Sequence, residues 1–153
     1  MFWRQVKSTK KAIEKLPISA KLVIVSRDGK ALVMRKDNGV MDLPGGKVEK
    51  GEDLFEAMAR EVSEETGLRV KKFEFVASWV KHHPVLGDRL VIVFEAQLKK
   101  RADALNLTLS DEHQWAKFMN ADEALSFSDM VPGYVNALQI CFSRYAPVED
   151  TPS

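Results

Sequence analysis

The chain has 153 residues, of which 45% are hydrophobic and 29% are charged, and its formal net charge is +1. This length and composition suit one globular domain with one core, and the small net charge gives no electrostatic reason to expect nucleic acid or membrane partners. The apolar runs are far too short for a transmembrane helix, and no apolar leader follows Met1, so we expect a cytoplasmic protein.

The first predicted elements are a helix and a hairpin. Residues 2–15 carry loosely spaced apolar residues among lysines, which favours a short amphipathic helix that ends before Pro17. Residues 21–26 and 31–35 are rich in β-branched and aliphatic side chains. Asp28-Gly29 lies between them, and this dipeptide between two such runs predicts a β-hairpin.

The next element is a helix that begins after Asp53 and ends at Gly67. Asp53 is a suitable N-cap, and Gly67 is suited to the left-handed conformation that ends many helices. At about 100° per residue, one face carries an apolar stripe and the adjacent face carries three carboxylates. The stripe contains Phe55, Met58, Val62 and Thr66, and the carboxylates are Glu61, Glu64 and Glu65.

Strands and helices alternate irregularly after this helix, which indicates a mixed β-sheet between helices in a single α/β domain. We assign residues 1–146 to this domain and residues 147–153 to a disordered tail. Cys141, the only cysteine, lies in an apolar stretch and is expected to be a buried thiol. The remaining predicted strands are 72–80, 89–98 and 114–119, a helix starts at 120–123, and the final helix covers 131–145.

The three clustered glutamates predict a metal site. Glu61 and Glu65 form a like-charged i, i+4 pair, which is unfavourable without a counter-ion. Carboxylate oxygens suit a hard divalent cation such as Mg²⁺, for which Mn²⁺ can substitute. The preceding Gly45 and Gly46 are predicted to form a loop that lets a phosphate chain approach the backbone closely. The pattern therefore indicates metal-assisted chemistry on a diphosphate.

This segment resembles the signature of the Nudix hydrolases, G-x5-E-x7-R-E-U-x-E-E-x-G-U, in which U is a bulky aliphatic residue. Every fixed position is filled, by Gly46, Glu52, Arg60, Glu61, Val62, Glu64, Glu65, Gly67 and Leu68. The resemblance implies a Nudix-type α/β/α sandwich with a mixed β-sheet and an Mg²⁺-dependent pyrophosphohydrolase. A MutT-like subgroup is one version of it.

Roles for single residues follow from the charges and from this resemblance. Glu61 and Glu64 are expected to act in catalysis, and they and Glu65 to bind metal together with the Gly45 carbonyl. Glu52 and Arg60 are expected to pair structurally. The residues expected outside the metal site are Gly46, Lys47 and Asp129 for substrate and Glu112 for catalysis, with Asp111 and His113 as alternatives to Glu112.

Several other side chains have two readings that the sequence leaves open. His82 and His83 either assist a leaving group or are exposed loop residues. Glu95 is a strand residue that can point toward the glutamate helix. The aromatic residues Trp79, Trp115 and Phe127 either stack on a nucleobase or belong to the core.

The predicted activity is hydrolysis of a nucleoside diphosphate linked to another group. One version cleaves (d)NTPs to the monophosphate and pyrophosphate, and the alternative is a nucleotide-sugar or ADP-ribose hydrolase. A non-catalytic nucleotide-binding module is the third hypothesis, and the intact set of glutamates argues against it. The expected partner is a small nucleotide substrate, with no nucleic acid or membrane, and a homodimer stays open.

Overall fold

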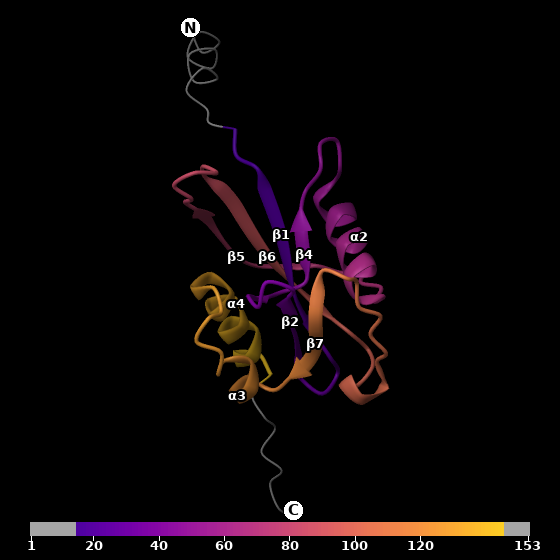
Figure 1. Ribbon diagram of the computed structural model, residues 1–153. Helices are drawn as coiled ribbons and strands as arrows, with labels where there is room; N and C mark the ends of the chain where they lie inside the picture. The colour runs from indigo at the N-terminus through magenta and orange to yellow at the C-terminus, as the bar shows by residue number, and fades with distance from the viewer. Residues whose placement is uncertain (1–14, 146–153) are drawn as a thin grey trace, which may run out of the picture.

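Seven strands form one mixed β-sheet in the computed structural model, which describes residues 15–145 (Figure 1). The predicted N-terminal helix, apart from Lys15, and the tail from residue 147 lie outside the described residues. The strands are β1 (Ile18–Val25), β2 (Ala31–Lys36), β3 (Met41–Asp42), β4 (Gly45–Lys47), β5 (Glu74–Lys81), β6 (Arg89–Gln97) and β7 (His113–Met119). The helices are α2 (Leu54–Thr66), α3 (Ala121–Ala124) and α4 (Pro132–Ser143), with a 3₁₀ turn at Ala102–Ala104.

Strand β1 lies at the centre of the sheet, in the order β3-β2-β1-β6-β5. It runs parallel to β6 and antiparallel to β2 and β4, while β7 pairs with β2. Being covered on both faces, β1 is buried over nearly its whole length, as expected for a central strand. The short strand β4 opposes its first half, with Lys21 paired to Gly45.

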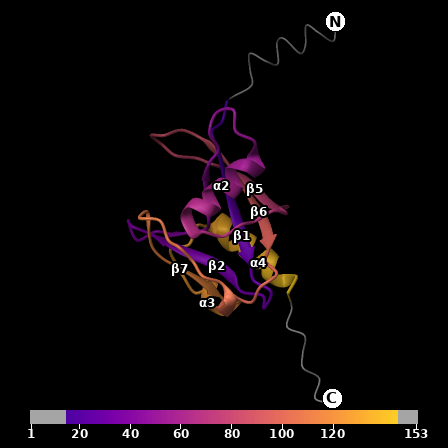
Figure 2. The ribbon, with the colours of Figure 1, turned by 90° about the vertical axis from the view of Figure 1, so that its right-hand side faces the viewer.

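Two apolar cores lie on the two faces of the sheet. Leu22 and Ile24 of β1 pack with Met58 and Val62 of α2, whereas Val23 and Val25 pack with α4 side chains such as Leu138. This alternation is the period-two geometry of a strand. Figures 1 and 2 show α2 and α4 on opposite sides of β1. The predicted α/β/α sandwich with a mixed sheet is confirmed.

Helix α2 begins and ends where the sequence predicts. The Asp53 side chain accepts a hydrogen bond from the Phe55 N–H at 3.2 Å, and Gly67 has φ +75° at the C-terminal cap. Met58, Val62 and Thr66 of the predicted stripe are buried. Phe55 is 47% exposed and stacks on Phe73, with ring centroids 5.4 Å apart. The helix is thus fixed on the sheet, and the face that carries the three glutamates lies at the edge of this packing interface.

One local prediction was wrong, and one open possibility is excluded. Gly45 and Gly46 form part of strand β4 instead of a loop, because their backbone pairs with β1. Glu95 is buried, but it points toward the end of α4, where it accepts hydrogen bonds from Tyr145 (3.0 Å) and Arg144 (3.2 Å). Burial alone would raise the pKa of Glu95, yet hydrogen bonds from its neighbours keep that pKa below its usual value.

Cys141 is a buried thiol, as predicted, and burial raises its pKa. A thiol in such surroundings is a packing group with little nucleophilic character. None of the helices within residues 15–145 is long and apolar enough to cross a membrane.

Candidate active site

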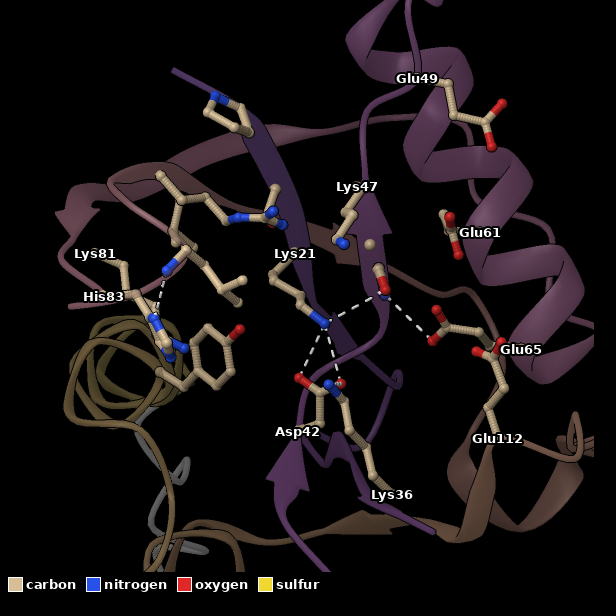
Figure 3. A pocket seen from close by; sticks show the side chains of 18 of the residues that line it. Lys21, Lys36, Asp42, Lys47, Glu49, Glu61, Glu65, Lys81, His83 and Glu112 are labelled. Atoms are coloured by element: carbon tan, nitrogen blue, oxygen red, sulfur yellow. Dashed lines mark hydrogen bonds and ion pairs between the residues drawn. The ribbon is translucent and has the colours of Figure 1, made fainter. Parts of the chain in front are cut away.

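A cavity of about 660 Å³ opens beside β4, between α2 and the β5–β6 hairpin (Figure 3). Elements far apart in sequence build it: β1, β2, β3, β4, α2, the hairpin, the start of β7 with the residue before it, and α4. Its polar lining includes Lys21, Lys36, Asp42, Lys47, Glu49, Glu61, Glu65, Lys81, His83, Arg89, Glu112 and His113. Such a volume is within the usual range for small-molecule sites.

Gly45 can only be glycine in this fold. Its φ is +126°, and a Cβ built on it would lie 2.1 Å from the Ala20 carbonyl oxygen and 2.9 Å from the Lys21 Cα. Both contacts are with backbone of the neighbouring strand, which has no rotamer with which to move away. The glycine therefore lets β4 pair tightly with β1 at the edge of the cavity.

At Gly46, a larger residue would meet a neighbouring side chain and not the backbone of β1. A Cβ there would lie 2.8 Å from the carboxyl carbon of Glu61 and about as close to both its oxygens. The Glu61 carboxylate thus lies directly against the bare backbone of β4. A helix side chain and a strand backbone are brought together at this point, where a ligand on β4 would also meet the carboxylate.

Glu65 is one turn further along α2 and is only 4% exposed. Its Oε2 accepts a hydrogen bond from the Gly45 N–H at 3.4 Å. Burial raises the pKa of Glu65 to about 8, the positive charge of Lys21 opposes this, and the adjacent Glu61 adds to it. Two neighbouring carboxylates, one of them buried, form a site that favours a proton or a cation.

Arg60 lies beside this cluster and binds several carboxylates. It pairs bidentately with Glu52, with Nε–Oε2 at 2.6 Å and Nη2–Oε1 at 3.0 Å. The same guanidinium donates to Glu61 at 3.2 Å and to Glu64 at 3.3 Å. The predicted Glu52–Arg60 pair is thus present, and it ties the loop before α2 to the helix.

Glu64 differs from the other two glutamates. Its side chain is 60% exposed, turns toward Arg60 and does not line the cavity. Within residues 15–145, no three acidic, imidazole or thiol groups stand close enough together to form a ready-made metal site. The structure therefore brings together Glu61, Glu65 and the Gly45 backbone, and leaves Glu64 at the rim.

A buried ion pair lies beneath the glycine strand. Lys21 donates to both carboxylate oxygens of Asp42, at 2.9 and 3.0 Å, and to the carbonyls of Leu43 at 3.2 Å and Gly45 at 3.4 Å. Both side chains are less than a tenth exposed. The ammonium group connects β1, β3 and β4 through these four contacts, which fixes the direction of the Gly45 carbonyl.

The wall opposite the glutamates is basic. Figure 3 shows Lys81 and His83 across the cavity from Glu61, Glu65 and Glu112, with Lys21 and Lys47 between them. Arg89 also lines this wall and donates to the Ser19 hydroxyl at 2.8 Å. The cavity thus separates an acidic side from a basic side, which suits a ligand that carries phosphates and a bound cation together.

Glu112, which directly precedes β7, and His113, the first residue of β7, line the cavity, whereas Asp111 does not. Glu112 is exposed, while His113 is buried and its Nε2 has no hydrogen-bond partner within the described part of the chain. Burial lowers the pKa of His113, which keeps the imidazole neutral. Of the three alternatives that the sequence leaves open, two therefore reach the cavity.

A sequence profile of the NUDIX domain matches residues 15–139, most of the chain. The chain belongs to the Nudix hydrolase family. The crystal structure of a MutT protein from Methanosarcina mazei Go1 superposes with a TM-score of 0.71 and 26% identity, over 86% of this chain and 96% of that one.

Two further relatives carry names that point to different roles. A methanol dehydrogenase activator of Bacillus methanolicus is 26% identical over 128 residues, which are 78% of this chain and 67% of the relative. An ADP-ribose pyrophosphatase of Bacillus subtilis is 30% identical over 96 residues, 60% of this chain and 51% of the relative. The match spans only about half of that second relative, so family and fold are shared while the substrate is not fixed by it.

Several residues that the sequence suggests for substrate contacts lie outside the cavity. Asp129 does not line the cavity; it lies 3.7 Å from Arg35, whose guanidinium covers the Trp115 ring. Trp79, Trp115 and Phe127 pack against the core on the α4 side of the sheet and are absent from the cavity wall. His83 lines the cavity, while the neighbouring His82 pairs with Asp88 at 2.7 Å.

Sequence reasoning missed the Lys21–Asp42 pair and the basic wall. One signal was available, because a lysine within a largely apolar strand has to find a partner when that strand is central. The partner, Asp42, lies in β3, which pairs with β2 before the chain returns to β1 through β4, and the local pattern predicted neither of these short strands. Lys81 ends β5 and Arg89 begins β6, and the β5–β6 register pairs them directly opposite each other beside the turn.

Proposed function

We propose that this Nudix hydrolase is an Mg²⁺-dependent pyrophosphohydrolase, which cleaves a nucleoside diphosphate linked to another group. The observation that carries the proposal is the arrangement of one cavity: carboxylates of α2 on one side, cations of the hairpin on the other, and the glycine backbone of β4 between them. A phosphate anhydride with a bound cation matches both sides at once.

The oxygen groups beside β4 fit a hard divalent cation. Glu61 and Glu65 would supply carboxylates and Gly45 a backbone carbonyl, with Glu64 available from the rim. A cation there would also favour the ionised form of Glu65, whose burial otherwise disfavours it. When bound, Mg²⁺ would polarise a phosphate oxygen and lower the pKa of a water molecule; Mn²⁺ is expected to substitute for it.

The rest of the chemistry is positioning by the chain's own residues. A phosphate would approach the bare Gly46 backbone, against which the Glu61 carboxylate lies, and Lys47, Lys81 and Arg89 would hold the remaining phosphate charge. Glu112 lies on the same side of the cavity as Glu61 and Glu65 and is the candidate general base. No covalent nucleophile is needed for such a transfer.

Two classes of substrate are compatible with this proposal. In the first, a (d)NTP gives a nucleoside monophosphate and pyrophosphate, as the superposition on a MutT protein suggests. In the second, a nucleotide sugar or ADP-ribose is split, which the name of the Bacillus subtilis relative and the cavity volume of about 660 Å³ favour. Turnover of NTPs, oxidised dNTPs, ADP-ribose and nucleotide sugars with Mg²⁺ tests the two versions directly.

We predict that every product set contains a phosphomonoester such as a nucleoside monophosphate, because attack falls inside the diphosphate link. Hydrolysis in ¹⁸O-labelled water, read by mass spectrometry, locates the attacked phosphorus. Label found only in orthophosphate released from an NTP would indicate a terminal phosphatase. That result would contradict the proposed reaction even if Mg²⁺ and the glutamates proved essential.

We also predict an absolute requirement for a divalent cation, with Mg²⁺ or Mn²⁺ active and Ca²⁺ poor, since Ca²⁺ is larger and its coordination looser. Excess EDTA should abolish turnover, and added Mg²⁺ should restore it. Circular dichroism with EDTA provides the control that the fold is retained. Full turnover in EDTA would exclude the metal-dependent mechanism.

A further inference from the structure

A second cavity, of about 650 Å³, lies at the C-terminal end of α2. It is lined by residues 67–72, which follow α2, by residues 97–100 at the end of β6, and by residues 104–106 after the 3₁₀ turn. No described residue lines both this cavity and the candidate active site. Figure 1 shows the turn after β6 at the lower right, below α2.

The rim of this second cavity is strongly basic. Its lining contains five cationic side chains and no Asp or Glu; the five are Arg69, Lys71, Lys72, Lys99 and Lys100. None of them lies within 4.0 Å of a carboxylate in residues 15–145, whereas Arg60, Arg101 and Arg144 all have such partners. The whole chain carries only +1, so the excess of positive charge is local.

The floor of the cavity is apolar. Leu68 and Val70 are 7% and 8% exposed and alternate with Arg69 and Lys71, which places the aliphatic side chains inward. Leu98 and Leu105 pack against the same core. A metal cation would be repelled by this rim, and a neutral ligand would leave the like charges uncompensated.

The shape of the basic rim favours a compact ligand over a nucleic acid strand. Proteins that bind single strands place cations along a track and stack bases on aromatic side chains. Here the cations surround one hollow, and no aromatic residue lines it. We propose that this cavity binds a small organic anion with at least two phosphate groups, at a site separate from the active site.

Inorganic tripolyphosphate is a suitable probe, used with the full chain in EDTA and at constant ionic strength. Binding is measured by calorimetry and by the shift in melting temperature, so the result does not depend on any enzymatic turnover. We expect the double variant Lys72→Gln/Lys99→Gln to bind at least about tenfold more weakly, the scale of one lost charged hydrogen bond. The control Lys50→Gln/Lys117→Gln removes the same charge from exposed lysines outside both cavities and should bind like the wild type.

Amide NMR shifts locate the bound probe. Shifts in residues 67–72 and 97–106 support the proposal, whereas shifts confined to residues 45–47 and the hairpin would place the ligand in the active site and overturn it. Equal weakening in both double variants, or an effect reproduced by NaCl, would mean general screening and would also overturn it. Binding of a thymidine oligomer without binding of tripolyphosphate would contradict the small-anion assignment. A failed hydrolysis assay, by contrast, would leave this test unaffected.

Discussion

Glu61→Gln and Glu65→Gln are each expected to lower kcat by at least about 10²-fold, the scale of losing a key electrostatic group. Glutamine removes one negative charge and almost no volume. Glu61 lies against Gly46, and Glu65 accepts a hydrogen bond from the Gly45 N–H. The change therefore affects cation binding beside β4 while the contacts that position the helix remain.

The fold should survive both substitutions. Burying a neutral amide at position 65 costs less than burying a charge, so the melting temperature of Glu65→Gln should equal or exceed that of the wild type. Circular dichroism and thermal melting check this point. Steady-state kinetics over a range of Mg²⁺ concentrations then separate a weaker metal affinity from a slower chemical step.

Two variants on the same helix serve as controls. Glu56→Gln changes an exposed glutamate in the first turn and should leave kcat unchanged. Glu64→Gln tests the rim position, and a loss as large as that of Glu61→Gln would mean that Glu64 leaves Arg60 when the cation binds. Near-wild-type turnover in both Glu61→Gln and Glu65→Gln would remove the metal site from α2.

Helix α2 and the arrangement of its carboxylates were predictable because their signals are local. The N-cap Asp53, the left-handed Gly67 and the apolar stripe lie within one short segment, and helix geometry alone places the glutamates on the adjacent face. The pairing of Glu52 with Arg60 was predictable for the same reason, since a loop and the helix that follows it have little freedom. The roles of these residues remain proposals that the variants above test.

The rest of the cavity depends on strand pairing across long stretches of sequence. Lys21 meets Asp42 only because β3 pairs with β2 and β4 pairs with β1, and neither short strand has a clear period-two pattern. Lys81 and Arg89 converge because β5 and β6 form a hairpin at this edge. Contacts of this kind follow from tertiary register, which residue spacing in one sequence does not encode directly.

Asp129 and the aromatic residues illustrate a second limit. Their residue types suit nucleobase recognition, and their positions in the sequence are compatible with it. The structure places Trp115, Phe127 and Arg35 in one cluster against the core on the α4 side of the sheet, with Asp129 as the partner of Arg35. Side-chain chemistry alone did not distinguish a ligand contact from packing.

Gly45→Ala is expected to lower the free energy of unfolding by at least about 2 kcal/mol and to abolish activity. The methyl group would overlap the Ala20 carbonyl and the Lys21 Cα, and the residue would keep a φ of +126° that L-amino acids rarely adopt. Overpacking and backbone strain each cost about 1–3 kcal/mol. Strand β4 would have to move away from β1, which would displace the Gly45 carbonyl and Glu65 together. Urea unfolding and steady-state kinetics measure the two effects.

Substitutions at two other glycines separate the effect of backbone strain from the effect of steric overlap. Gly51→Ala also has a positive φ, of +81°, but meets nothing within 4 Å, so its loss of stability measures positive-φ strain without overlap. Gly46→Ala contacts only the flexible Glu61 carboxylate and should retain most of its stability while kcat falls, because that carboxylate is pushed off the strand. If Gly45→Ala were no less stable than Gly51→Ala, the close approach of β4 to β1 would not be needed for the fold. If Gly46→Ala were fully active, Glu61 would not act from its position beside the Gly46 backbone.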